Sequence, residues 1–184
     1  MNTMKIRDLT LHLNDTEGAT SDDDAGVRSE RAVRHAREFI ETFERSTCRS
    51  IAPEQRRPIA DHLWNAHVDG DSCANCPYFE ALAPWRAILA TTSLWLAWAE
   101  RERKRPDRRA IWSAFKTLST YLSLQAEGLR KGTRFSLREA NGRRQLKDGN
   151  NRVRLLAAMD RGELEVEVSE SCGPTPMSPP PVNR

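Results

Sequence analysis

The residues with the clearest capacity for chemistry lie near the end of the chain, where Gly149, Asn150, Asn151 and Arg152 precede apolar residues at helical spacing. The first N–H groups of a helix have no partner within the helix, and they attract anions. A glycine lets a phosphate group approach the backbone closely, and an arginine adds a planar fork of donors. The segment therefore predicts a phosphate site at a helix start.

The distribution of charge favours such a ligand. Residues 1–100 carry 11 basic and 16 acidic side chains, whereas residues 101–184 carry 18 basic and 10 acidic. A basic half favours a polyanionic partner, of which nucleic acid is the usual one, although an uneven surface or a solvated helix end would also explain the charges. The cations expected to contact phosphate are Arg101, Arg103, Lys104, Arg105, Arg108, Arg109, Arg143 and Arg144.

The four cysteines allow a metal site. Two of them have the C-x-x-C spacing of half a zinc knuckle, and a tetrahedral site needs two further ligands. The predicted zinc ligands are Cys48, Cys73, Cys76 and His67. His62 or Cys172 could take the place of His67. A second C-x-x-C pair is absent, so a redox-active pair and thiols without a role stay open as alternatives.

Periodicity indicates the elements that must position these residues. Leu9, Leu11 and Leu13 alternate, which predicts a strand over residues 5–13. Apolar residues at helical spacing predict helices over 29–46, 58–68, 77–103 and 111–128, the second beginning at Pro58. Later in the chain, a hairpin over 133–147 turns at Asn141-Gly142. A helix over 148–160, with Gly162 as its C′ residue, and a strand over 164–168 complete the prediction.

These elements predict an α+β protein, in which a mainly helical N-terminal region is followed by a small hairpin–helix–strand unit. We expect a strand and acidic linker over 1–28, and a helical region with the cysteine and histidine cluster over 29–109. The α+β unit then occupies 110–170. Residues 171–184 are rich in proline and are expected to be disordered.

The order of elements over residues 133–168 resembles the core of the ParB/sulfiredoxin-like superfamily. In that core a hairpin leads into a G-x-x-R helix start, and an alanine-rich helix, a glycine and a strand follow. Here the matching residues are Gly149 with Arg152, then Ala157-Ala158 and Gly162. The resemblance implies a ParB-like module whose relatives bind nucleotides or act with DNA, with Gly149 and Arg152 holding phosphate.

The chain also departs from that pattern. ParB-type CTP-binding proteins carry a glutamate and adjacent arginines in this turn, where this chain has Asn150 and Asn151 before a single Arg152. Sulfiredoxins place a cysteine and a histidine there, and this chain has neither. We therefore expect no sulfiredoxin reaction. Binding of a phosphate or of a nucleic-acid backbone needs only a helix start and a cation.

The sequence thus predicts a protein that binds nucleic acid or the phosphate of a nucleotide, with zinc as a structural cofactor. One alternative is a ParB-like nuclease or nucleotide hydrolase, in which Asp148 would hold a metal or activate water. A second alternative is a small adaptor protein stabilised by zinc. No signal peptide is evident and no apolar run is long enough to cross a bilayer, so we expect a cytoplasmic protein without a membrane partner.

Overall fold

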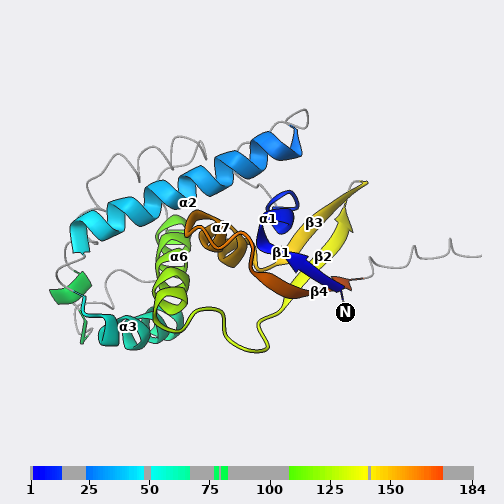
Figure 1. The fold of residues 1–184 in the computed structure, drawn as a ribbon. Helices are drawn as coiled ribbons and strands as arrows, with labels where there is room; N and C mark the ends of the chain where they lie inside the picture. The colour runs from blue at the N-terminus through cyan, green and yellow to red at the C-terminus, as the bar shows by residue number, and fades with distance from the viewer. Residues whose placement is uncertain are drawn as a thin grey trace, which may run out of the picture.

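The computed structural model describes residues 2–13, 24–47, 51–66, 77–78, 80–82, 108–140 and 142–171. The helices are α1 (Ile6–Thr10), α2 (Ala25–Thr47), α3 (Pro53–Ala66), α6 (Arg108–Glu127) and α7 (Asn150–Ala158). The strands are β1 (Asn2–Lys5), β2 (Phe135–Ala140), β3 (Arg143–Asp148) and β4 (Glu165–Ser171). The α+β class is confirmed, with long helices ahead of a hairpin, a short helix and a strand (Figure 1).

The strands form one sheet in the order β1-β4-β2-β3, so the two ends of the described chain meet in it. β2 and β3 form the predicted antiparallel hairpin, while β4 runs parallel to β2 and antiparallel to β1. The hairpin turns at Gly142, which has a φ of +69°. Side chains alternate across the sheet, and Leu137, Leu146 and Val168 are buried on its core face.

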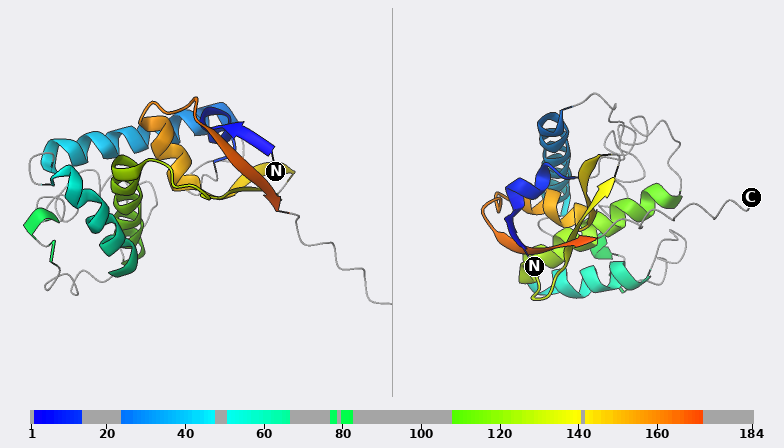
Figure 2. Two further views of the ribbon diagram at one scale, coloured as in Figure 1. Left: turned by 60° about the horizontal axis from the view of Figure 1, so that its bottom comes forward. Right: turned by 90° about the vertical axis from the view of Figure 1, so that its right-hand side faces the viewer.

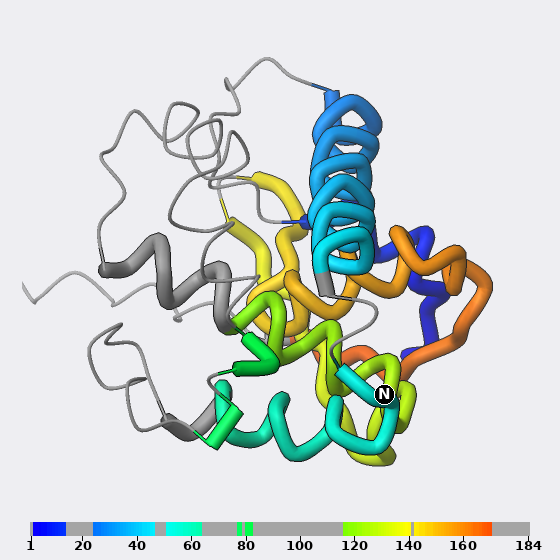
Figure 3. Tube along the Cα trace, turned by 90° about the vertical axis from the view of Figure 1, so that its left-hand side faces the viewer, coloured from blue at the N-terminus to red at the C-terminus, as the bar shows by residue number. Residues whose placement is uncertain are grey.

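Helix α2 is long: its first residues lie near α1 and β1, and its last residues lie near α3 (Figure 2). Its buried stripe includes Ala36 and Phe43, which confirms the predicted apolar face. Helix α6 lies between α3 and α7 (Figure 3), and its residues Leu118 and Leu122 are buried as the pattern predicts. Gly128 ends α6 with a φ of +70°, and its N–H donates to the Leu124 carbonyl at 2.9 Å.

A partly buried carboxylate joins three of the helices. Glu44 of α2 accepts hydrogen bonds from the Tyr121 hydroxyl at 2.7 Å and from Gln125 Nε2 at 3.1 Å, both on α6. It also pairs with Arg56 of α3 at 3.1 Å. Burial acts to raise the pKa of Glu44, but these donors outweigh burial and the pKa lies below its ordinary value. Burial and the adjacent carboxylate raise the pKa of Tyr121.

The predicted strand over residues 5–13 is wrong. Only Asn2–Lys5 form a strand, and the chain turns into α1 at Ile6. Ile6 and Leu9 are fully buried, three residues apart, whereas Leu11 is 50% exposed. The N–H groups of Ile6 and Arg7 donate to carbonyls at positions 164 and 162, both at 3.0 Å. A contact with a distant part of the chain thus starts this helix, and the local pattern could not reveal it.

Two helix boundaries also differ from the prediction. Helix α3 begins at Pro53, a residue type that suits the first helical position, and it contains Pro58 as its sixth residue. The left-handed C′ residue that follows α7 is Asp160 and not the predicted Gly162, because Asp160 has a φ of 58°. The N–H of Asp160 donates to Ala157 at 3.1 Å and that of Arg161 to Leu156 at 2.9 Å, which is a Schellman motif with Asp160 as C′.

Several predictions fall outside the residues that the structure describes. They include most of the acidic linker, most of the helix predicted over 77–103, and the tail after residue 171. Within the described residues, no helix is long and apolar enough to cross a membrane.

Candidate phosphate-binding site

Gly149 occupies the N-cap of α7 in the left-handed region, with φ 99° and ψ 4°. A Cβ at this position would lie 2.6 Å from Cδ1 of Phe135, whose ring is 1% exposed on the core face of the sheet. The glycine is therefore required by its own backbone angle and by a buried ring. Phe135 covers the side of Gly149 toward which a Cβ would point, so a phosphate cannot approach from there, and the prediction that Gly149 binds phosphate stays a prediction.

The two asparagines stabilise the turn into α7. Asn150 Nδ2 donates to the carbonyl of Leu146 at 2.9 Å, which ties the helix start to β3. Asn151 Oδ1 accepts from Arg154 Nη2 at 2.5 Å, one turn along the helix. No side chain in the part of the chain that the structure describes caps the first N–H groups of α7. The side chains of Asn150 and Asn151 thus stabilise the local fold, and the prediction that these two residues bind phosphate stays a prediction.

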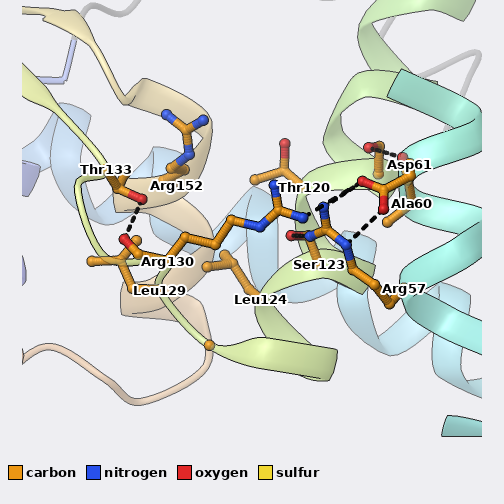
Figure 4. Close-up of a pocket in the computed structure, with 12 residues that line it drawn as sticks. Arg57, Ala60, Asp61, Thr120, Ser123, Leu124, Leu129, Arg130, Thr133 and Arg152 are labelled. Carbon is orange, nitrogen blue, oxygen red and sulfur yellow. Dashed lines mark hydrogen bonds and ion pairs between the residues drawn. The ribbon is translucent and has the colours of Figure 1, made fainter. Parts of the chain in front are cut away.

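Arg152 differs from its neighbours because its guanidinium makes no hydrogen bond or ion pair within the described part of the chain. It lies at the edge of a cavity of about 240 Å³ between α3, α6, the 128–133 loop and the start of α7. The cavity is lined by Arg57, Ala60, Asp61, Ser119, Thr120, Ser123, Leu124, Gly128, Leu129, Arg130, Thr133 and Arg152. Figure 4 shows Arg152 at one end of this set and Arg57 with Asp61 at the other.

The remaining charges of the cavity are paired. Arg57 makes two hydrogen bonds to the Asp61 carboxylate, one of them at 2.9 Å, and donates to the Ser123 hydroxyl at 2.5 Å (Figure 4). Arg130 lies 3.6 Å from Asp61 through Nη2 and 3.1 Å from Glu127 through Nε. Two arginines therefore face two carboxylates, and Arg152 is the excess positive charge of the site.

The size of the cavity limits what it can enclose. Pockets that bury a drug-sized ligand have volumes of about 300–1,000 Å³. A cavity of about 240 Å³ is smaller than this range. It has room for one phosphate group of a larger molecule, while the rest of that molecule would lie outside. The Nη1 group of Arg130 can add donors there, because the two contacts of Arg130 with carboxylates use Nε and Nη2.

The two predicted arginines of the hairpin lie on opposite faces of the sheet. Arg144 shares the core-side face with Leu146 and is ion-paired with Glu170 of β4. Both partners of this ion pair are more than half exposed, and the prediction that Arg144 contacts phosphate stays a prediction. Arg143 is exposed on the other face, at the outer end of the hairpin.

Asp148, the residue that a hydrolase would need, is separate from the cavity. One extra residue in β3 lies between the pairs Leu137–Leu146 and Ser136–Asp148, so β3 contains a bulge at Lys147. Asp148 Oδ2 accepts a hydrogen bond from the Ser136 hydroxyl at 3.0 Å on the outer face of the sheet. Asp148 does not line the cavity beside Arg152.

The predicted metal ligands cannot be placed, because Cys48, Cys73, Cys76 and His67 all lie outside the described residues, as does Cys172. His62 is described, and its ring meets that of Tyr78 edge to face at 5.4 Å. Among the described residues no group of three or more metal-binding side chains comes together. The zinc prediction stays a prediction.

Most of the basic run predicted to contact phosphate also lies outside the described residues, namely Arg101, Arg103, Lys104 and Arg105. Arg108 and Arg109 form the first residues of α6, and the structure does not describe their side chains. Their contribution to phosphate binding therefore stays a prediction.

Sequence reasoning missed Arg57, Asp61 and Arg130. The i,i+4 spacing of Arg57 and Asp61 is visible in the sequence and is typical of a helical ion pair. Their distance from Arg152 along the chain hides the association, since α3 reaches the cavity only by packing against α6.

Comparison with known proteins identifies no relative of this chain. No protein-family model matches the chain, and neither a curated protein nor a solved structure is significantly similar to it. The resemblance to the ParB/sulfiredoxin-like superfamily therefore stays a prediction, although the hairpin, helix and strand follow one another in the expected order.

Proposed function

We propose that this protein binds a phosphate group of a nucleic acid or of a nucleotide in the cavity beside Arg152, without converting it chemically. The observation that carries the proposal is the excess charge of the cavity. Arg57 and Arg130 are balanced by Asp61 and Glu127, whereas Arg152 has no partner within the described residues. A phosphate would supply that missing partner and could accept several hydrogen bonds from the guanidinium.

The uncapped start of α7 supports the same ligand. Arg152 is the third residue of this helix, so its side chain and the first N–H groups of α7 belong to one turn. The positive end of the helix dipole adds to the attraction for an anion. The size of the cavity favours recognition of the phosphate alone, with no contribution from a base or a sugar inside it.

The hydrolase alternative has no comparable support. A hydrolytic site needs a carboxylate beside the bound phosphate to hold a metal or to activate water. Asp148 is engaged with Ser136 on the outer face of the sheet, and Asp61 is ion-paired with Arg57. The zinc-stabilised adaptor depends on residues outside the described ranges, and no observation on the described residues favours it.

The direct test compares Arg152→Gln with Arg161→Gln. Arg161 is exposed and does not line the cavity, so the two variants lose the same charge at different places. Pyrophosphate and nucleoside triphosphates would be titrated by calorimetry. A hydrogen bond to a charged group contributes about 1.5–3 kcal/mol, so Arg152→Gln should weaken binding by about ten- to a hundredfold. Equal affinity of the two variants, or no binding by the unmodified protein, would overturn the proposal.

A further inference from the structure

The outer face of the sheet has a group of cations that the cavity does not use. Arg134 directly precedes β2, Arg138 lies within it, and Lys147 is the extra residue of the bulge in β3. All three side chains are exposed. Arg134, Ser136 and Arg138 share one face because strand residues alternate, as the sequence predicts. We call Arg134, Arg138 and Lys147 the basic sheet face.

Within the described residues, these cations differ from other cations of the sheet and of α1 in having no partner. Lys5 and Arg7 pair with Glu163, and Arg144 pairs with Glu170. Arg134, Arg138 and Lys147 make no ion pair or hydrogen bond through their side chains within the residues that the structure describes. Their charge is therefore available to an external anion.

We propose that the basic sheet face binds the phosphate backbone of double-stranded nucleic acid. Arg134 and Arg138 are four positions apart in extended chain, a distance of about 13 Å, which spans more than one phosphate along one strand of a duplex. The face thus presents cations to more than one phosphate at a time. This proposal rests on the function proposed above, and of its two ligands it favours a nucleic acid over a free nucleotide.

The composition of this face favours a duplex over a single strand. Single-stranded nucleic acid is bound by aromatic side chains on which bases stack. None of the residues that share this face on β2 and β3 is aromatic; they are Ser136, Arg138, Ala140, Arg143, Gln145, Lys147 and Asp148. Contacts to phosphates need no access to the bases, which a duplex keeps inside.

The adjacent strand restricts where the polyanion can lie. Glu165 and Glu167 are exposed on β4, on the side opposite the buried Val166 and Val168. They repel phosphate and confine a duplex to the half of the sheet formed by β2 and β3. The chain links this half to the cavity, because Thr133, which lines the cavity, immediately precedes Arg134.

The test uses two triple variants with equal loss of charge in the full-length protein. One removes the basic sheet face (R134Q/R138Q/K147Q), and the control removes paired cations (K5Q/R7Q/R144Q). Binding of a labelled DNA duplex, an RNA duplex and a single strand of the same sequence would be followed by fluorescence anisotropy over a range of salt concentrations. Each lost phosphate contact reduces the salt slope by about 0.9, so the first variant should reduce it by about 2–3 and the control by less than about 1.

Further measurements distinguish an error in the duplex proposal from an error in the cavity proposal. Glu167→Gln should tighten duplex binding, a gain that misfolding cannot produce. Pyrophosphate binding should persist in R134Q/R138Q/K147Q and be weakened in Arg152→Gln. Equal effects of the two triple variants, or a single strand bound as tightly as the duplex, would overturn the inference while leaving the cavity proposal intact. Duplex binding that depends on the basic sheet face, without pyrophosphate binding, would overturn the cavity proposal alone.

Discussion

Replacement of Gly149 by alanine is the sharpest test of how the start of α7 is built. With a φ of 99°, an alanine would adopt a left-handed conformation that costs about 1–2 kcal/mol. The new Cβ would also lie 2.6 Å from Cδ1 of Phe135. The Phe135 ring is buried and cannot move away freely, and overpacking of this kind costs about 1–3 kcal/mol. The two effects together predict a loss of about 2–5 kcal/mol in the free energy of unfolding.

Gly132→Ala is the matched control. Gly132 also has a positive φ, of +81°, but nothing lies within 4 Å of a Cβ built there. This variant should lose only the cost of backbone strain, about 1–2 kcal/mol. Urea unfolding of both variants, followed by circular dichroism, measures the difference. Equal losses would refute the packing of Phe135 on Gly149. Unchanged stability of Gly149→Ala with lost phosphate binding would restore Gly149 as a ligand-binding residue.

Three further predictions concern stability. Tyr121→Phe removes a donor to the Glu44 carboxylate and should cost about 1.5–3 kcal/mol in urea unfolding at neutral pH. Because the pKa of Glu44 is lowered in the folded state, its contribution is present above the ordinary value of 4.5 and is lost as the pH falls through the folded pKa. The stability difference between Tyr121→Phe and the unmodified protein should therefore shrink in acid, and a constant difference would contradict this assignment. Asp160→Gly relieves a φ of 58° but breaks the exposed ion pair with Arg37, and a net gain of up to about 1 kcal/mol should raise the melting temperature.

The sequence correctly predicted those elements whose conformation is decided by residues close together in the chain. The Asn-Gly signal predicted the β2–β3 hairpin, and the spacing of Ala36 and Phe43 predicted the buried face of α2. Gly128 ends α6 as expected. In each case the deciding interaction lies within a few residues of the pattern.

One wrong prediction reflects distant contacts and the other a local conformation that aspartate can adopt. Helix α1 starts where it does because carbonyls at positions 162 and 164 accept its first N–H groups, far along the chain. Asp160 adopts the left-handed conformation that we assigned to Gly162, since aspartate tolerates it and the Schellman bonds stabilise it.

The candidate site was predicted only in part. Arg152 could be singled out from the motif, but the residues that decide its role could not. Phe135 covers Gly149, and Glu170 pairs with Arg144, through contacts across the sheet. Arg57 and Arg130 reach the cavity through the packing of α3 and the 128–133 loop against α6. Tertiary packing thus brings Arg57 and Arg130 to the cavity beside Arg152, an association that the sequence does not reveal.

The measurement that tests the central claim most directly is the ¹⁵N–¹H spectrum of the Arg152 guanidinium during titration with pyrophosphate at constant ionic strength. The account predicts a saturable shift of the Arg152 Nε–H signal and of the backbone amides that begin α7, with smaller changes at Arg161. An unchanged Arg152 signal, or shifts of equal size at Arg152 and Arg161, would contradict it.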